Sequence, residues 1–358
     1  MGKQKGGIME RNYSIDRMKF LCCIAVVCIH TSPFKDYAIG TIINVVSRVA
    51  VPLFFVSSGY LFYGNFNLNY TKKYIIKIAK LFISWTIFYI ILGLSLASIS
   101  NILNGNNVFY GYKDYFSQFN IIDLYYTKGI IKYHLWYLSS TIIIIPILYL
   151  IIKNNWINKF MIITLVINIL GIFIYNSGLE IVETTRDAIF LGLFYSAMGV
   201  YININEKLLK NKFSKKISFK YMIVILSFII ISIVERGLYD IYFPKTADFY
   251  ISTIPLTFLL FMLCIIRDSK KESFIANIGA NSVGIYLIHI AFIDIIDIVL
   301  FKLNLTSITM TKYWQIIYTP IIIILSYISY REIQKIKFKI ISTLTNYKVV
   351  SKLNIKSQ

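Results

Sequence analysis

Six ionisable side chains lie within or beside strongly apolar segments of this chain and are the best placed to do chemistry: Lys19, His30, Arg48, His134, Arg186 and Glu235. An ionisable group within a membrane span is costly, so it usually faces a bundle interior or a water-filled cavity and marks a functional site. A histidine changes its charge near neutral pH, which suits it to take a proton from an alcohol that attacks an acyl carbonyl. His30 is therefore the candidate general base, and Glu235 is the candidate acid that orients it.

Structural roles are the alternative for several of these residues. His134 and Arg186 are also typical of anchors at a membrane–water interface, and Lys19 is typical of positive charges at the inner face. His289 lies some way into an apolar segment and is more typical of a hydrogen-bonded packing residue. His30 and Arg48 are harder to explain as anchors, because neither lies at an end expected to face the cytoplasm.

The composition indicates an integral membrane protein. Of 358 residues, 57% are hydrophobic and 15% are charged, and the mean hydropathy is +0.66, far above that of an ordinary soluble domain. The formal charge of +20 would suggest nucleic acid in a soluble chain. In a membrane protein the same excess arises from basic cytoplasmic loops, so we expect the lipid bilayer, and no nucleic acid, as a partner.

Ten apolar segments are long enough to approach the roughly 20 residues that cross a bilayer. The sequence therefore predicts an all-α, polytopic membrane protein. The predicted segments are 17–33, 41–63, 74–99, 134–152, 157–176, 187–204, 218–235, 249–266, 282–301 and 313–330.

The distribution of charge predicts the orientation of these segments. Most of the 37 Lys and Arg fall in alternate loops that begin with the N-terminal tail, as the positive-inside rule requires of cytoplasmic loops. We therefore expect both termini in the cytoplasm. We divide the chain into a membrane domain, residues 1–333, and a basic cytoplasmic tail, residues 334–358.

The heights of the ionisable residues in this topology divide them into two groups. Lys19 and His30 are eleven residues apart, a rise of about 16 Å, so Lys19 lies near the inner face and His30 near the outer end of the first segment. His134 opens the segment 134–152, which descends from the outside. Arg48 lies some seven residues into the segment 41–63, counted from the outside, and Arg186 and Glu235 lie at the outer ends of their segments. The sequence thus predicts an outer pocket with these members: His30, Arg48, His134, Arg186 and Glu235.

The four cysteines suggest packing, not chemistry. Cys22, Cys23, Cys28 and Cys264 all fall in predicted helices and lack the spacing of metal ligands. We expect no metal.

Four ordered motifs give the chain a family resemblance. The first contains a basic residue and a later histidine, here Lys19 and His30, and resembles the first-helix signature of the membrane acyltransferase 3 family. The others resemble its second-helix, fourth-helix and C-terminal motifs. In order, the four read "IDRMKFLCCIAVVCIH", "RVAVPLFFVSSGYLF", "HLWYL" and "NSVGIYLIH".

This resemblance implies ten or so helices and transfer of an acyl group, commonly acetyl from acetyl-CoA, to a hydroxyl of a carbohydrate or cell-envelope acceptor. It makes His30 catalytic and places Lys19 where the family usually has an arginine that handles the acyl donor. Lysine keeps the charge but lacks the planar fork that binds phosphate bidentately. We assign acceptor binding or oxyanion stabilisation to Arg48 and Arg186, acceptor binding to His134, and support of His30 to Glu235.

Within this family, "SRVAVPLFF" and "TTRDAIF" resemble the membrane half of the vancomycin-resistance serine racemases. That resemblance implies a second function, the transport of a small amino acid such as L-serine, with the arginines and Glu235 binding its carboxylate and ammonium groups. A third alternative is a sensor or assembly subunit without catalysis, which the paired Lys19 and His30 argue against. Since no racemase-like segment follows the membrane segments in this sequence, we expect an O-acyltransferase.

Overall fold

The computed structural model describes residues 11–103, 108–117, 120, 122–127, 131–179, 184–214, 219–243, 248–267 and 271–355. Throughout these residues the secondary structure is helical, and no strand occurs. The protein is therefore an all-helical, multi-pass membrane protein.

The first half of the described chain contains nine helical elements. They are α1 (Tyr13–Thr31), α2 (Ala38–Ser47), α3 (Ala50–Gly64), α4 (Leu68–Leu103), α5 (Val108–Ser117), α6 (Asp123–Tyr126), the 3-10 turn η1 (Tyr133–Leu135), α7 (Trp136–Lys153) and α8 (Ile157–Asn176).

The second half contains nine more. They are the π-helix η2 (Ala188–Gly192), α9 (Leu193–Ile204), α10 (Glu206–Ser214), α11 (Phe219–Tyr242), α12 (Thr253–Ile266), α13 (Phe274–Ala280), α14 (Ser282–Lys302), the 3-10 turn η3 (Thr306–Met310) and α15 (Lys312–Ile355).

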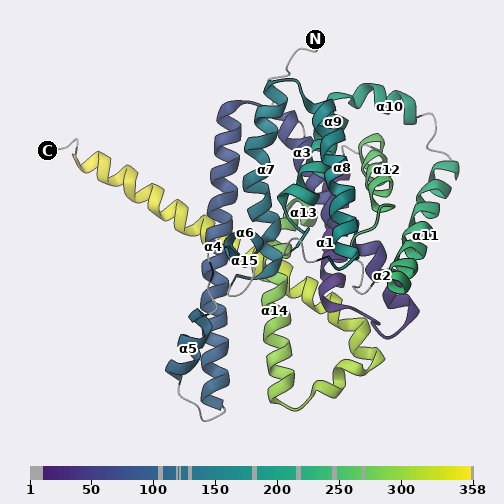
Figure 1. Ribbon diagram of the computed structural model, residues 1–358. Coiled ribbons are helices and arrows are strands. Elements are labelled where there is room, and N and C mark those ends of the chain that lie inside the picture. Colours follow the sequence, from purple (N-terminus) through teal and green to yellow (C-terminus); the bar gives the residue numbers. More distant parts are fainter. Residues whose placement is uncertain are drawn as a thin grey trace.

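Each of the ten predicted segments overlaps a helix, but fewer helices meet the length and composition of a membrane span. Seven do so in the described chain, with α2 and α3 counted together, and up to eight if α9 and α10, which meet at a bend of 82°, form one span. The remaining two segments fall on α1, which carries three charged residues, and on α12, which has only 14 residues. Figure 1 shows α10 lying across one end of the bundle, near the N-terminus.

A proline explains why the second predicted segment is two helices. Pro52 has no N–H to donate to the carbonyl four residues earlier, and its ring collides with that carbonyl in a continuous helix. The carbonyl belongs to Arg48, and the break falls at Arg48 and Val49. The sequence therefore places Arg48 at an interruption inside the apolar bundle.

Two glycines allow α3 and α9 to pack closely against each other. Gly59 of α3 lies against the backbone of Ser196, and Gly199 of α9 lies against the backbone of Val56 and Tyr60. A Cβ at either glycine would overlap these main-chain atoms. Small residues commonly allow membrane helices to approach this closely.

This contact predicts a difference between two glycine substitutions. Gly199→Ala should lower the thermal midpoint of the detergent-solubilised protein, because overpacking typically costs about 1–3 kcal/mol. Gly237→Ala on α11 is the matched control, since nothing lies within 4 Å of the Cβ it would add. Equal thermal midpoints for the two variants would show that α3 and α9 do not pack this closely.

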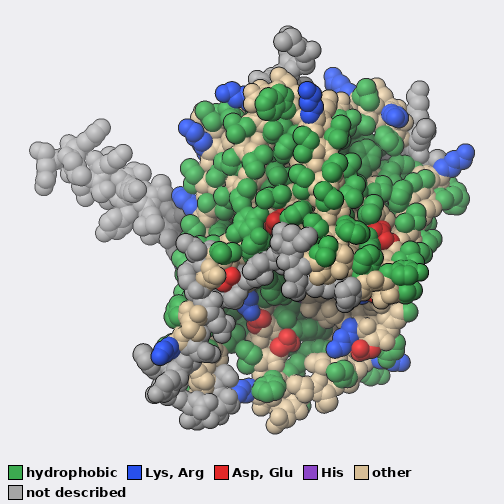
Figure 2. Space-filling view, in the orientation of Figure 1, with side chains coloured by type: hydrophobic (Ala, Val, Ile, Leu, Met, Phe, Trp, Pro, Cys, Tyr) green, Lys and Arg blue, Asp and Glu red, His purple; other side chains and the backbone are tan. Residues whose placement is uncertain are grey.

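The surface has the pattern of a lipid-facing bundle. Large apolar side chains are exposed on several helices, for example Ile83 on α4, Ile162 on α8 and Ile230 on α11. Figure 2 shows apolar side chains over most of one face, basic side chains along the edge near the N-terminus, and a hollow lower down where acidic and basic side chains gather. Apolar exposure of this extent indicates a membrane environment.

Candidate active site

All three histidines of the chain meet in one cluster, although they come from three distant elements. The ring centroids of His30 on α1 and His289 on α14 are 5.2 Å apart, and those of His289 and His134 on η1 are 5.5 Å apart. His134 and His289 are buried, whereas His30 is partly exposed. His30 is thus the ring of this cluster that a substrate can reach.

Backbone carbonyls fix the tautomers of the two buried rings. His134 Nε2 lies 3.3 Å from the carbonyl oxygen of Leu287, and His289 Nδ1 lies 2.7 Å from that of Tyr286. A carbonyl oxygen only accepts, so each of these nitrogens must donate. His134 Nδ1 and His289 Nε2 therefore carry lone pairs, and both are buried without a hydrogen-bond partner among the described residues.

The partly exposed ring of His30 has a hydroxyl partner. His30 Nδ1 lies 3.2 Å from the Tyr133 hydroxyl oxygen, and the two rings pack with centroids 5.3 Å apart. When Nδ1 donates to this oxygen, the Nε2 atom of His30 carries the lone pair. The ring is then oriented and ready to accept a proton from a hydroxyl on its free side.

Tyrosines and an ion pair hold the η1 turn against α14. The Tyr286 hydroxyl donates to the carbonyl of His134, and the Tyr89 hydroxyl donates to that of Leu287 at 2.7 Å. Lys132, just before η1, pairs with Asp294 of α14 at 2.7 Å. The turn that carries Tyr133 and His134 is therefore held on α14 by the Tyr286 hydroxyl and the Lys132 ion pair, and Tyr89 joins α4 to the same stretch of α14.

A second polar cluster surrounds Asp248. Its carboxylate pairs with Arg48 at 2.7 Å and with Arg186 at 3.6 Å, and it accepts a hydrogen bond from the Tyr175 hydroxyl at 2.7 Å. Both arginines lie close enough to His30 to act on it electrostatically. Two cations thus share one carboxylate beside the histidine cluster.

Glu235 makes contacts different from those expected of a partner for His30. Its carboxylate accepts hydrogen bonds from the backbone N–H of Ile251 at 2.6 Å, and from the N–H and hydroxyl of Ser252 at 3.0 and 2.6 Å. These donors lie at the start of α12, where helical N–H groups lack internal partners. Among the described contacts, none joins Glu235 to His30.

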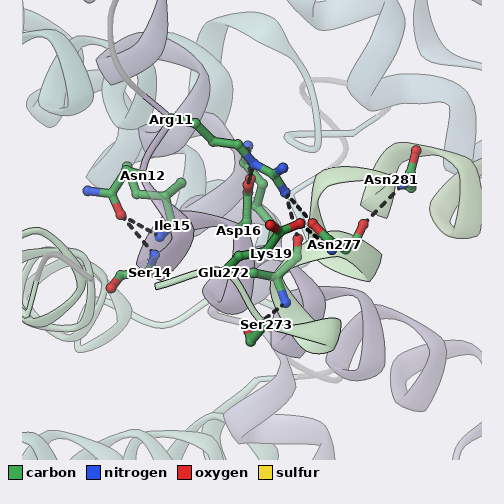
Figure 3. A network of polar contacts seen from close by, with 11 residues as sticks. Arg11, Asn12, Ser14, Ile15, Asp16, Lys19, Glu272, Ser273, Asn277 and Asn281 are labelled. Atoms are coloured by element: carbon green, nitrogen blue, oxygen red, sulfur yellow. Dashed lines mark hydrogen bonds and ion pairs between the residues drawn. The ribbon is translucent and has the colours of Figure 1, made fainter. Parts of the chain in front are cut away.

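Lys19 lies in a separate network at the other end of α1 (Figure 3). Its Nζ atom is 3.5 Å from one oxygen of Asp16, while Arg11 Nε binds the other oxygen at 2.7 Å. Arg11 also donates to Asn277 Oδ1 and to the Ala276 carbonyl on α13. The hydrogen bond with Asp16 raises the pKa of Arg11, so the tighter ion pair of this network is the one that Arg11 makes.

Lys19 and His30 point along the same face of α1. Eleven residues correspond to about three turns at 3.6 residues per turn, so the two side chains lie nearly in line and about 16 Å apart along the axis. Between them, Cys23 donates to the carbonyl of Ser282 at 3.1 Å. This face of α1 packs against α13 and α14, which also carry His289.

No metal site is evident in the part of the chain that the structure describes. No group of three or more His, Cys, Asp and Glu side chains is arranged to hold an ion. The three histidine rings meet through ring packing, and two of their nitrogens are already engaged by carbonyls.

Comparison with known proteins identifies the class to which this bundle and its histidine cluster belong. The model of the acyltransferase 3 family, described as an acyltransferase domain, matches residues 12–331. The chain therefore belongs to this family, and the domain implies acyltransferase activity and an acyl donor.

Curated relatives share part of their length with this chain. An amino-acid racemase of Enterococcus faecalis is 25% identical over 302 residues, which are 76% of this chain and 38% of the racemase. A second amino-acid racemase of the same organism is 31% identical over 144 residues, 37% of this chain and 18% of the racemase. The chain thus spans less than two fifths of either relative. No solved structure matches.

Two members of the cluster differ from the expectations drawn from the sequence. Tyr133 was not among the candidate residues, although it directly precedes the "HLWYL" motif. His289 was interpreted as a packing residue, and it is indeed buried and hydrogen-bonded, but it also contacts the ring of His30. Its place at the end of the "NSVGIYLIH" motif was the signal available for including it.

The burial pattern predicts selective chemical modification. Diethyl pyrocarbonate should modify His30 in the detergent-solubilised protein and leave His134 and His289 largely unmodified, because only His30 is accessible. Peptide mass spectrometry measures the extent at each site, with urea-unfolded protein as the control in which all three react. Modification of His289 at the rate of His30 in folded protein would contradict the described burial.

Proposed function

We propose that the protein is a membrane O-acyltransferase that moves an acetyl group from cytoplasmic acetyl-CoA to a hydroxyl of a carbohydrate or cell-envelope acceptor. The observation that carries this proposal is the position of His30, the accessible ring of a three-histidine cluster in a member of an acyltransferase family. Tyr133 orients it through Nδ1, and no described residue is hydrogen-bonded to its Nε2.

The proposed reaction uses His30 first as a base. Nε2 takes the proton of the acceptor hydroxyl while the oxygen attacks the acyl carbonyl, and the new C–O bond forms as the C–S bond to coenzyme A breaks. The proton then passes to the departing thiolate, so the products are the ester and free coenzyme A. Tyr133 would hold Nδ1 and stabilise the ring while it is protonated.

The two arginines of the Asp248 cluster would stabilise the negative charge that develops near the His30 ring. Arg48 and Arg186 are fixed by one shared carboxylate, which leaves a surplus of positive charge for the oxyanion or the acceptor. His134 is buried and contacts the ring of His289, so it would contribute to acceptor binding by holding His289 in place beside His30. Since Glu235 is engaged at the start of α12, we assign it the positioning of that helix and not a catalytic role.

The donor would bind near Lys19. Arg11 makes the shorter ion pair with Asp16, so Lys19 is only loosely held at 3.5 Å and can turn toward the phosphates of coenzyme A. The acyl group would travel along the face of α1 that joins Lys19 to His30. We further propose ten crossings with both termini in the cytoplasm, and residues 1–333 as the membrane domain.

The basic tail, residues 334–358, would lie beyond this domain. Helix α15 continues through position 333 without a break, and residues 356–358 lie outside the described part of the chain. The boundary at 333 therefore remains a prediction drawn from the charge pattern.

A second candidate function is transport of a small amino acid such as L-serine. It is favoured by the similarity to two proteins named amino-acid racemase, and by the arginine pair, which suits a carboxylate. Uptake of labelled serine by vesicles containing the protein, without consumption of acetyl-CoA, would favour this function over acyl transfer.

The acyltransferase proposal predicts the effect of removing the base. His30→Ala should lower transfer from radiolabelled acetyl-CoA to a cell-envelope extract by about 10²–10⁴-fold, the usual contribution of general acid–base catalysis. Tyr133→Phe keeps the imidazole and should reduce transfer less. Expression and the elution volume of the purified variants serve as controls for folding. Wild-type transfer by His30→Ala would refute the mechanism.

The donor assignment makes a separate prediction. Lys19→Gln should raise the KM for acetyl-CoA at least tenfold, because it removes a cation from the donor path, whereas Lys19→Arg should preserve binding. Lys153→Gln is the control, since Lys153 is an exposed cation at the end of α7. An unchanged KM in Lys19→Gln would move the donor site away from the inner end of α1.

A further inference from the structure

A cavity of about 160 Å³ opens beside the outer end of α1 and is lined by residues of α1, α2, α11 and the turn between α1 and α2. Three of the ten lining residues are cations: Lys35, Arg48 and Arg236. None of the ten is acidic. Ser32, Thr41 and Asn44 add hydroxyl and amide groups.

The balance of charge around this cavity favours an anion. Arg48 shares Asp248 with a second arginine, and Arg236 pairs with Asp240 at 2.6 Å. Lys35 is exposed and has no ion pair among the described residues; Asp36 follows it in sequence but does not line the cavity. The neighbouring carboxylates therefore neutralise only part of the positive charge.

The same balance disfavours a free amino acid in this cavity. An amino acid would need an acceptor for its ammonium group as well as donors for its carboxylate. The nearby carboxylate of Asp248 is already engaged by two arginines and by the Tyr175 hydroxyl. Guanidinium, ammonium and hydroxyl donors converging from several directions instead suit the several oxygens of a phosphate.

The position of the cavity relates it to His30. Cys28, which lines it, is two residues before His30 on α1 and, at 100° per residue, lies about 160° around the helix from the imidazole. Ser32, which also lines it, is the residue that caps the end of the helix. A group in the cavity is thus separated from the histidine cluster by the last turn of α1. One extended acceptor passing the end of this helix can reach both places.

We propose that this cavity is a phosphate-binding subsite and that it holds a phosphodiester group of the acceptor while a hydroxyl of the same molecule reaches His30. The phosphate site stands on the cavity alone, whereas its assignment to the acceptor rests on the proposed acyl transfer. The other source of the same chemistry is the phosphodiester of a lipid headgroup in the outer leaflet.

The test measures binding of glycerophosphoglycerol to the full-length protein in phosphatidylcholine nanodiscs by calorimetry, without an acyl donor. We expect saturable binding that weakens with salt, and no binding of glycerol. Lys35→Glu and Arg236→Gln should weaken binding at least tenfold. Lys312→Glu, which reverses an exposed cation at the start of α15 outside the cavity, should stay within twofold of wild type.

Three outcomes would overturn the proposal: equal binding of glycerol, no binding of the phosphodiester, or equal effects of Lys35→Glu and Lys312→Glu. Nanodiscs containing phosphatidylglycerol distinguish the source, because displacement of the probe there would overturn the acceptor assignment in favour of the headgroup. His30→Ala should bind the probe normally. If His30→Ala loses acyl transfer but still binds the probe, catalysis and the phosphate site can be judged separately.

Discussion

The structure around the histidines depends on a reciprocal exchange of hydrogen bonds between η1 and α14. The ring of His134 donates to a carbonyl of α14, and the Tyr286 hydroxyl of α14 donates to the carbonyl of His134. In a bilayer, backbone groups that leave the helical pattern must find partners within the protein. The Tyr286 hydroxyl supplies such a partner for the carbonyl of His134, in the turn that precedes α7. The exchange also fixes the proton of His134 on Nε2.

The same exchange determines how the other two histidines meet. Because η1 is held on α14, Tyr133 and His289 approach His30 from two elements that are more than 150 residues apart in sequence. The ion pair between Lys132 and Asp294 strengthens the contact between η1 and α14. Its attraction is larger in the low dielectric of the bundle than it would be in water. A displacement of η1 would therefore change both the partner of His30 and the environment of His289.

The sequence was sufficient to predict most of the long apolar helices, because apolar runs of spanning length are a strong local signal, but shorter helices such as α5, α10 and α13 were not predicted. All ten predicted segments fall on helices, and the family resemblance was confirmed over residues 12–331. The break at Arg48 was not predicted, although Pro52 provides a local cause for it. The partners of the side chains were harder to predict. Asp248 lies 200 residues after Arg48 in sequence, and Glu235 of α11 binds Ser252, which lies beyond the connection from α11 to α12. Height in the membrane restricts which groups can meet, but the rotation of each helix decides which do.

Both ends of α1 lie beside a carboxylate that is shared by two cations. At its N-terminal end, Arg11 and Lys19 share one buried carboxylate, Asp16, and Arg11 also joins this network to α13 through Asn277. Near its C-terminal end, two arginines share Asp248. At each end, two cations thus share one carboxylate, and in a low-dielectric bundle cations that are only partly paired attract anions more strongly than fully paired ones. In the proposed acyl transfer, these two sites would bind an anionic donor at one end of α1 and an anionic acceptor at the other, with His30 on the face that connects them.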